Sequence, residues 1–99
     1  MPLVNQYLEM IKERVLADLA GEDVAIGLFG SMAGGRAHTA SDVDIAVIPK
    51  GVWDRRKLTF LRERLEELNV PYVVELVDFS LVSRDFQEIA LENVLWWKE

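Results

Sequence analysis

The sequence has no cysteine, so a disulfide framework, a zinc–thiolate site and a cysteine nucleophile are excluded. It has a single histidine, His38, and this excludes a metal site built from several histidines. Any metal in this protein must therefore be held by oxygen ligands. Such ligands select hard ions such as magnesium or manganese.

The sequence also lacks an excess of positive charge and long apolar runs. Eleven Lys and Arg stand against 17 Asp and Glu, which gives a net charge of −6, and affinity for nucleic acid depends on cationic contacts. We therefore expect no direct nucleic-acid binding. No apolar run reaches the roughly 20 residues of a membrane span. Charges from Glu9 to Arg14 distinguish the first 15 residues from a secretion signal. We expect a cytoplasmic protein that does not enter membranes.

Apolar residues, which make up 51% of the 99 positions, are enough for the core of one small domain over residues 1–99. Apolar residues at steps of three and four predict amphipathic helices over residues 3–19 and from Trp53 to Leu68. Gly21 is placed to end the first helix. Three short apolar runs are predicted to be strands: residues 24–29, 43–48 and 72–79.

The C-terminal quarter predicts a last helix followed by an extended segment. Ser83 is the expected N-cap, and Asn93 could end the helix in the left-handed conformation. The inner face of this helix is predicted to consist of Phe86, Ile89 and Ala90. Together with the earlier elements, this predicts an α+β fold: a small mixed sheet of three to four strands with helices mainly on one face.

Two short motifs lie at the ends of the first two predicted strands, in the stretch GLFGSMAGGRAHTASDVDIAV. Gly30 and Ser31 follow the first strand, and Asp42 and Asp44 begin the second. Alternate strand residues share a face, so both aspartates project from one side and repel each other unless a cation lies between them. Magnesium binds one or two carboxylates together with phosphate oxygens. A glycine lets the backbone approach a phosphate, and Ser31 offers a hydroxyl. The pattern predicts a site for a nucleoside triphosphate and magnesium.

The same residues resemble the polymerase-beta-like nucleotidyltransferase superfamily, and in particular its minimal nucleotidyltransferases (the MNT family) of HEPN/MNT toxin–antitoxin pairs. The motif of that group is Gly-Ser-x-Ala-x-Gly-x-Ala followed by Ser-Asp-x-Asp. This chain supplies Gly30, Ser31, Ala33, Gly35, Ala37, Ser41, Asp42 and Asp44. The resemblance implies the nucleotidyltransferase fold and binding of ATP with magnesium, with Ser41 in the nucleotide site. Where relatives often carry arginines, this chain has Met32 and Gly34, and Arg36 is the candidate replacement for contacts with the triphosphate.

A third carboxylate would complete a two-metal site, and the sequence offers two candidates in the third strand. Aligned on the pattern of the relatives, Glu75 takes the position of a metal ligand and general base. Asp78 is the alternative. By strand alternation the two side chains point to opposite faces, so they cannot both serve one site.

The resemblance implies that AMP is transferred from Mg-ATP to a hydroxyl acceptor. In characterised pairs of the family, the acceptor is a tyrosine of a small helical HEPN-type toxin, and the transferase is its antitoxin. One alternative is a catalytically weak or inactive module that neutralises a helical partner by complex formation. A transferase for a small molecule such as an aminoglycoside is less favoured, because we expect no acceptor-binding domain.

Three further features have both an ordinary and a functional interpretation. His38 in the loop is either exposed or a contact to nucleotide or acceptor. The basic run 55–57 is either a solvated helix start or a phosphate contact. The pair Trp96 and Trp97 is hard to bury in so small a domain, and we interpret it as part of a partner surface.

Overall fold

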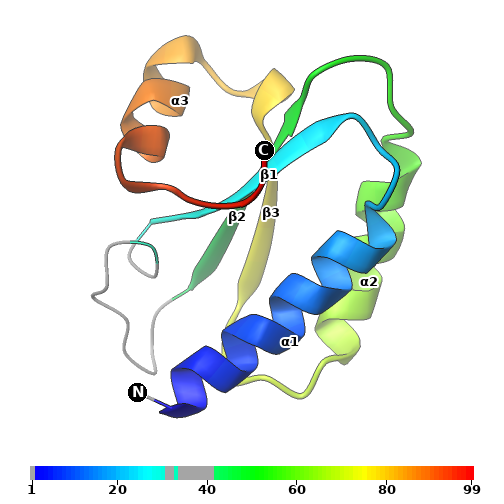
Figure 1. Cartoon of the computed structure of the whole chain (residues 1–99), viewed down its shortest axis with the longest axis vertical. Helices are drawn as coiled ribbons and strands as arrows, with labels where there is room; N and C mark the ends of the chain where they lie inside the picture. Colours follow the sequence, from blue (N-terminus) through cyan, green and yellow to red (C-terminus); the bar gives the residue numbers. More distant parts are fainter. Residues whose placement is uncertain (1, 31–32, 34–41) are drawn as a thin grey trace.

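The computed structural model describes residues 2–30, 33 and 42–99. The elements are, in chain order, helix α1 (Pro2–Asp18), strands β1 (Val24–Phe29) and β2 (Val43–Pro49), helix α2 (Arg56–Glu67), strand β3 (Val74–Asp78), the 3-10 turn η1 (Phe79–Leu81), helix α3 (Arg84–Ala90), the 3-10 turn η2 (Leu91–Asn93) and strand β4 (Leu95–Lys98) (Figure 1). The predicted helices and strands are all present, with ends within three residues of the expected positions.

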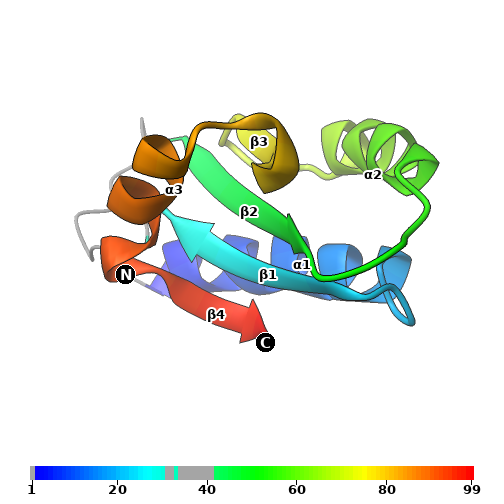
Figure 2. The same ribbon diagram turned by 90° about the horizontal axis from the view of Figure 1, so that it is seen from above.

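The four strands form one mixed sheet in the order β3-β2-β1-β4, as Figure 2 shows from above. Strand β1 is antiparallel to both β2 and β4, whereas β2 and β3 are parallel. A parallel pair needs a long crossover connection, and α2 lies in that connection. This confirms the predicted α+β fold with a mixed sheet.

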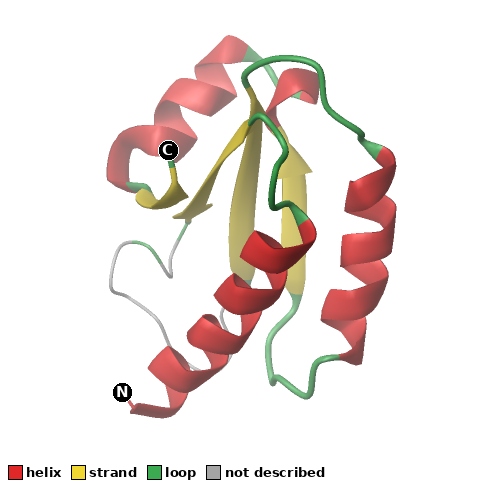
Figure 3. Ribbon diagram, turned by 45° about the vertical axis from the view of Figure 1, so that its right-hand side comes forward, coloured by secondary structure: helices red, strands yellow, loops and turns green. Residues whose placement is uncertain are grey.

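The larger part of the core lies on the face of the sheet covered by α1 and α2, which lie side by side (Figures 1 and 3). Residues at helical spacing in α1 and α2 meet alternate residues of the three longest strands, and all of them are buried. This set includes Ile11, Val15 and Leu19 of α1, Leu58, Leu61 and Leu65 of α2, and Val24, Ile26, Leu28, Val43, Ile45, Val47 and Leu76 of the sheet.

The other face of the sheet carries a smaller cluster beneath η1 and α3. It consists of Phe29, Ala46 and Phe79, with Val82 and Ala90 packed against it. Phe29 meets Phe79 and Phe86 edge to face, with ring centroids 5.5 Å and 6.2 Å apart. The two long helices thus share one face as expected, and the short α3 covers one end of the opposite face (Figure 3).

The last helix begins at the predicted residue, but the predictions for two of its later residues were wrong. The Ser83 hydroxyl accepts a hydrogen bond of 3.1 Å from the backbone N–H of Phe86, which confirms the N-cap. Ile89, however, is 70% exposed, so its assignment to the inner face was wrong. Asn93 lies in η2, and the positive φ angles of the described residues belong to glycines alone, so the left-handed ending was also wrong. The helix instead tightens into a 3-10 turn.

Strand β4 lies against β1 at a position where β1 has no side chain. Gly27 is paired with Trp96, and a Cβ on Gly27 would meet Val94 Cγ2 at 2.5 Å and the Trp96 ring at 3.2 Å. Trp97 is partly buried against the main core, whereas Trp96 remains 39% exposed. The two tryptophans therefore have different environments, and only Trp96 has the exposure that a partner surface needs.

Among the described residues, no helix is both long and apolar enough to cross a bilayer.

Candidate functional site

A row of side chains crosses the sheet where β1 ends and β2 begins. The strand register places Phe29 opposite Asp44, and Asp44 beside Glu75. Residues paired in this way in neighbouring strands project from the same face, with Cβ atoms about 5 Å apart. Asp42 stands two residues before Asp44, just outside the strand, and is exposed. The structure thus brings Asp44 and Glu75 together, and keeps Asp42 within electrostatic reach of Asp44.

Gly30 connects the first motif to the second through direct contact. Its φ angle is +77°, a conformation that favours glycine, and a Cβ there would lie 2.5 Å from Asp44 Oδ2. The backbone after β1 therefore passes directly against the Asp44 carboxylate. The sequence predicted a role for Gly30 towards phosphate but missed this contact. The contact depends on the pairing of β1 with β2, which the sequence does not give.

The Asp44 carboxyl group is in an environment that disfavours its charge. Burial raises its pKa above the ordinary value of 3.8, and the negative charges of Glu75 and Asp42, with a hydrogen bond to Glu75, raise it further. The adjacent Phe29 and its aromatic neighbours contribute an apolar wall on this face. No ion pair between described residues includes Asp42, Asp44 or Glu75. No cation among the described residues balances the negative charge here.

A group of carboxylates with no described cation beside it fits a hard divalent cation, which prefers oxygen ligands. Within the described residues, no three His, Asp or Glu side chains are arranged closely enough to hold a metal. Like charges repel, which opposes close approach of these carboxylates when no cation lies between them. The residue types and their shared face therefore suit magnesium, and the three carboxylates would have to draw together to bind it.

Asp78, the other candidate for the third carboxylate, is engaged elsewhere. It is 6% exposed, and its Oδ2 lies 3.3 Å from Arg55 Nε. Its Oδ1 accepts hydrogen bonds from the backbone N–H and the hydroxyl of Ser80, at 2.9 Å and 2.6 Å. Asp78 pairs with Val47, three residues along β2 from Asp44, or about 10 Å. It therefore holds η1 against the start of α2 and does not join the row at Asp44.

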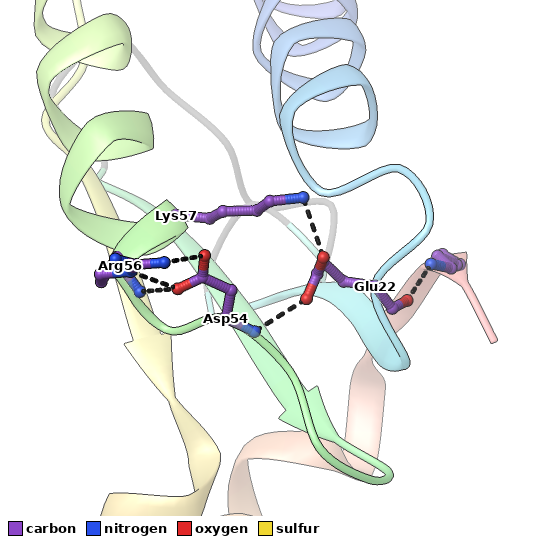
Figure 4. A network of polar contacts seen from close by, with 5 residues as sticks. Glu22, Asp54, Arg56 and Lys57 are labelled. Atoms are coloured by element: carbon purple, nitrogen blue, oxygen red, sulfur yellow. Dashed lines mark hydrogen bonds and ion pairs between the residues drawn. The ribbon is translucent and has the colours of Figure 1, made fainter.

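The basic run at the start of α2 is bound to carboxylates of the chain itself. Arg55 pairs with Asp78, Arg56 with Asp54, and Lys57 with Glu22. Figure 4 shows Glu22 accepting hydrogen bonds from Lys57 Nζ at 2.8 Å and from the backbone N–H of Asp54 at 2.9 Å. These contacts hold the turn after α1 to the start of α2. They give a structural role to the run, and nothing in them indicates a phosphate contact.

Several residues of the predicted site lie outside the described residues. They are Ser31, Arg36, His38 and Ser41. Their assignment to nucleotide or acceptor contacts stays a prediction from the sequence.

Comparison with known proteins shows the family to which this chain belongs. Residues 16–96 match the family described as "Polymerase beta, Nucleotidyltransferase". This chain belongs to that family. A curated relative, the probable protein adenylyltransferase MntA of Haemophilus influenzae, is 36% identical over 67 residues, which cover 68% of this chain and 59% of the relative. The chain thus spans less than two thirds of that relative's length.

Solved structures similar to this family member come from toxin–antitoxin complexes. One is described as a toxin–antitoxin with AMP-PNP; it has a TM-score of 0.66 and 25% identity, covering 87% of this chain and 71% of that one. Another is a complex of tri-AMPylated Shewanella oneidensis HEPN toxin with an MNT antitoxin, at a TM-score of 0.60 and 21% identity, covering 90% and 70%. The second likeness, at its low identity, supports the fold alone.

Proposed function

We propose that this protein transfers AMP from Mg-ATP to a hydroxyl acceptor, a tyrosine of a HEPN-type partner, and thereby acts as the antitoxin of a cytoplasmic toxin–antitoxin pair. The observation that carries the proposal is the pairing of Asp44 with Glu75 on one face, with Gly30 directly against the Asp44 carboxylate. The MntA relative and the toxin–antitoxin structures support the same activity and partner.

Each residue of the site has a role in this proposal. Asp42, Asp44 and Glu75 would hold one or two magnesium ions, which neutralise phosphate charge and orient the reacting oxygens when bound. The nucleotide would lie against the turn of Gly30 and Ser31, with Arg36 and Ser41 as further contacts. Glu75 accepts the proton of the acceptor hydroxyl. The acceptor oxygen forms a bond to the α-phosphorus, the bond to the β-phosphate oxygen breaks, and pyrophosphate leaves.

The test is to incubate the purified protein with a HEPN protein from the same genome and Mg-ATP, and to weigh the HEPN protein intact. We expect a gain of one or more AMP groups that is lost in Asp44→Asn and Glu75→Gln. Asp78→Asn is the matched control, because it removes a β3 carboxylate that lies outside the row. A gain in mass that depends on Asp78 and not on Glu75 would contradict the assignment.

The alternative function is an inactive module that neutralises its partner by binding alone. The absence of the arginines that relatives often carry at the positions of Met32 and Gly34 favours it. Calorimetry of ATP binding with and without magnesium distinguishes the two. Magnesium-dependent binding that is lost in Asp44→Asn supports the transferase, whereas a tight complex with the HEPN protein, without nucleotide binding or added mass, supports the binding module.

A further inference from the structure

A groove of about 530 Å³ runs along the outer edge of β3, the strand at one edge of the sheet. Its lining includes Arg62 and Glu66 of α2, Val73, and residues 74–77 of the strand. Successive residues of β3 face opposite sides of the sheet, yet residues 74–77 all line this groove. The groove therefore follows the backbone edge of the strand, with α2 as its other wall.

The backbone of β3 presents hydrogen-bonding groups to this groove. The carbonyl of Val73 accepts a hydrogen bond of 2.9 Å from the N–H of Val43, so Val73 directs its backbone groups towards β2. Because this direction alternates along a strand, Val74 and Leu76 direct theirs outward. The carbonyl of Leu76 accepts a hydrogen bond of 3.1 Å from Arg62, which agrees with this direction. The N–H groups of Val74 and Leu76 are thus placed to donate to a further strand.

The groove is continuous with the candidate site, because Glu75 belongs to both. A strand added beside β3 would lie about 4.8 Å away. Its residue opposite Glu75 would project from the face that carries Phe29, Asp44 and Glu75, with its Cβ about 5 Å from that of Glu75. A hydroxyl on that residue would reach the carboxylate that is proposed to take its proton.

We infer that the outer edge of β3 receives an extended segment of the acceptor protein as a fifth strand and so places the acceptor hydroxyl beside Glu75. This inference rests on the proposed function. Main-chain hydrogen bonds supply affinity in such strand addition, and the side chain opposite Glu75 supplies the choice of acceptor. Arg62 and Glu66 place charges of both signs on a lining that is otherwise mostly apolar, which suits a segment of mixed polarity.

The test compares Val74→Pro with Val74→Ala. Proline removes the outward N–H of residue 74 and is tolerated in an edge strand at such a position. Alanine keeps the N–H and removes a similar amount of apolar packing. We expect Val74→Pro to raise the KM for the HEPN protein about tenfold, since one main-chain hydrogen bond is lost and its acceptor is left unpaired, with an unchanged affinity for Mg-ATP. Val74→Ala should keep the wild-type KM, and thermal melts of both variants show whether they are folded.

A second measurement uses the wild-type protein. Amide hydrogen exchange of residues 73–77 should slow when the HEPN protein is added without ATP. Unchanged exchange, or equal KM values in the two variants, overturns the inference. The same holds if sedimentation shows that a second copy of this chain already covers the β3 edge. If the wild-type protein adds no AMP to the HEPN protein, it is the proposed function that fails, whatever the exchange shows.

Discussion

Both ends of the sheet carry carboxylates, but their surroundings favour the negative charge at one end and disfavour it at the other. At the end where β2 finishes and α2 begins, hydrogen bonds from Lys57 and from the backbone of Asp54 lower the pKa of Glu22 below its ordinary value of 4.5. At the end where β2 begins, burial and two neighbouring carboxylates raise the pKa of Asp44. One end is neutralised by the chain's own cations. At the other, no described cation balances the charge, which is typical of a site that works with a ligand.

The largest effect is expected for Asp44→Asn, which changes the end of the sheet where β2 begins. We expect AMP transfer to fall by about a hundredfold or more, because a displaced or missing ligand in such a clamp has a cost of this order. The melting temperature should rise, since the substitution removes a buried charge beside Glu75 and Asp42. Rates are measured by intact mass of the HEPN protein and stability by thermal melts. A variant that is as active as the wild type would contradict the site.

Gly30→Ala tests the contact between the two motifs. The positive φ and the approach to Asp44 Oδ2 should together destabilise the fold by about 2 kcal/mol and displace the carboxylate, lowering transfer about tenfold.

Gly21→Ala is the matched control for Gly30→Ala. Gly21 has a φ of +83°, but a Cβ there would meet no atom within 4 Å. We expect a destabilisation of about 1 kcal/mol from the backbone alone and an unchanged rate of transfer. Equal effects of both substitutions on transfer would mean that the contact with Asp44 has no role.

Asp78→Asn tests the opposite end of the sheet. The change removes the ion pair with Arg55, whose side chain is 52% exposed and can be hydrated when the pair is lost. We therefore expect a loss of only about 1–2 kcal/mol in the free energy of unfolding, measured by urea denaturation. Transfer should stay within about twofold of the wild type. A large loss of transfer in a folded protein would place Asp78 in the site instead.

The smallest expected effects concern pH. Glu22 has a lowered pKa, so its stabilising contribution is present at neutral pH and is lost as the pH falls through that value, below 4.5. Asp44 has a raised pKa, so its destabilising effect at neutral pH disappears as the pH falls through a value above 3.8.

Thermal melts of the wild type, Glu22→Gln and Asp44→Asn across this range measure both effects. At neutral pH the wild type should melt above Glu22→Gln and below Asp44→Asn, and both differences should shrink on acidification. If either difference grew as the pH fell, the corresponding pKa direction would be wrong.

The sequence predicted the fold well because local patterns determine most of it. The run 24–29 is apolar and short between Asp23 and Gly30, and it is the strand β1 without a residue added or lost. Ser83 caps its helix through a bond to a residue three positions away, which a local pattern can also reveal. Ile89 was assigned wrongly because helical spacing shows that a residue shares a face with Phe86, but not how far the sheet extends beneath it.

The sequence offered the residue types of the candidate site but not their contacts. Alternation along β3 separated Glu75 from Asp78, but only the register of β2 with β3 shows which of them meets Asp44. The contact of Gly30 with Asp44 depends likewise on the pairing of Phe29 with Asp44. Pairing between strands that are distant in sequence is a tertiary property, so no local pattern could have revealed it.

The position of β4 has a consequence for synthesis on the ribosome. Strand β1 lies inside the sheet only because Leu95–Lys98 pair with it, and these residues leave the ribosome after the other three strands. Until they emerge, β1 is an unpaired edge strand with no side chain at Gly27. Unpaired strand edges are prone to pair with other chains. A frameshift or premature stop before Leu95 would therefore yield a truncated protein prone to aggregate.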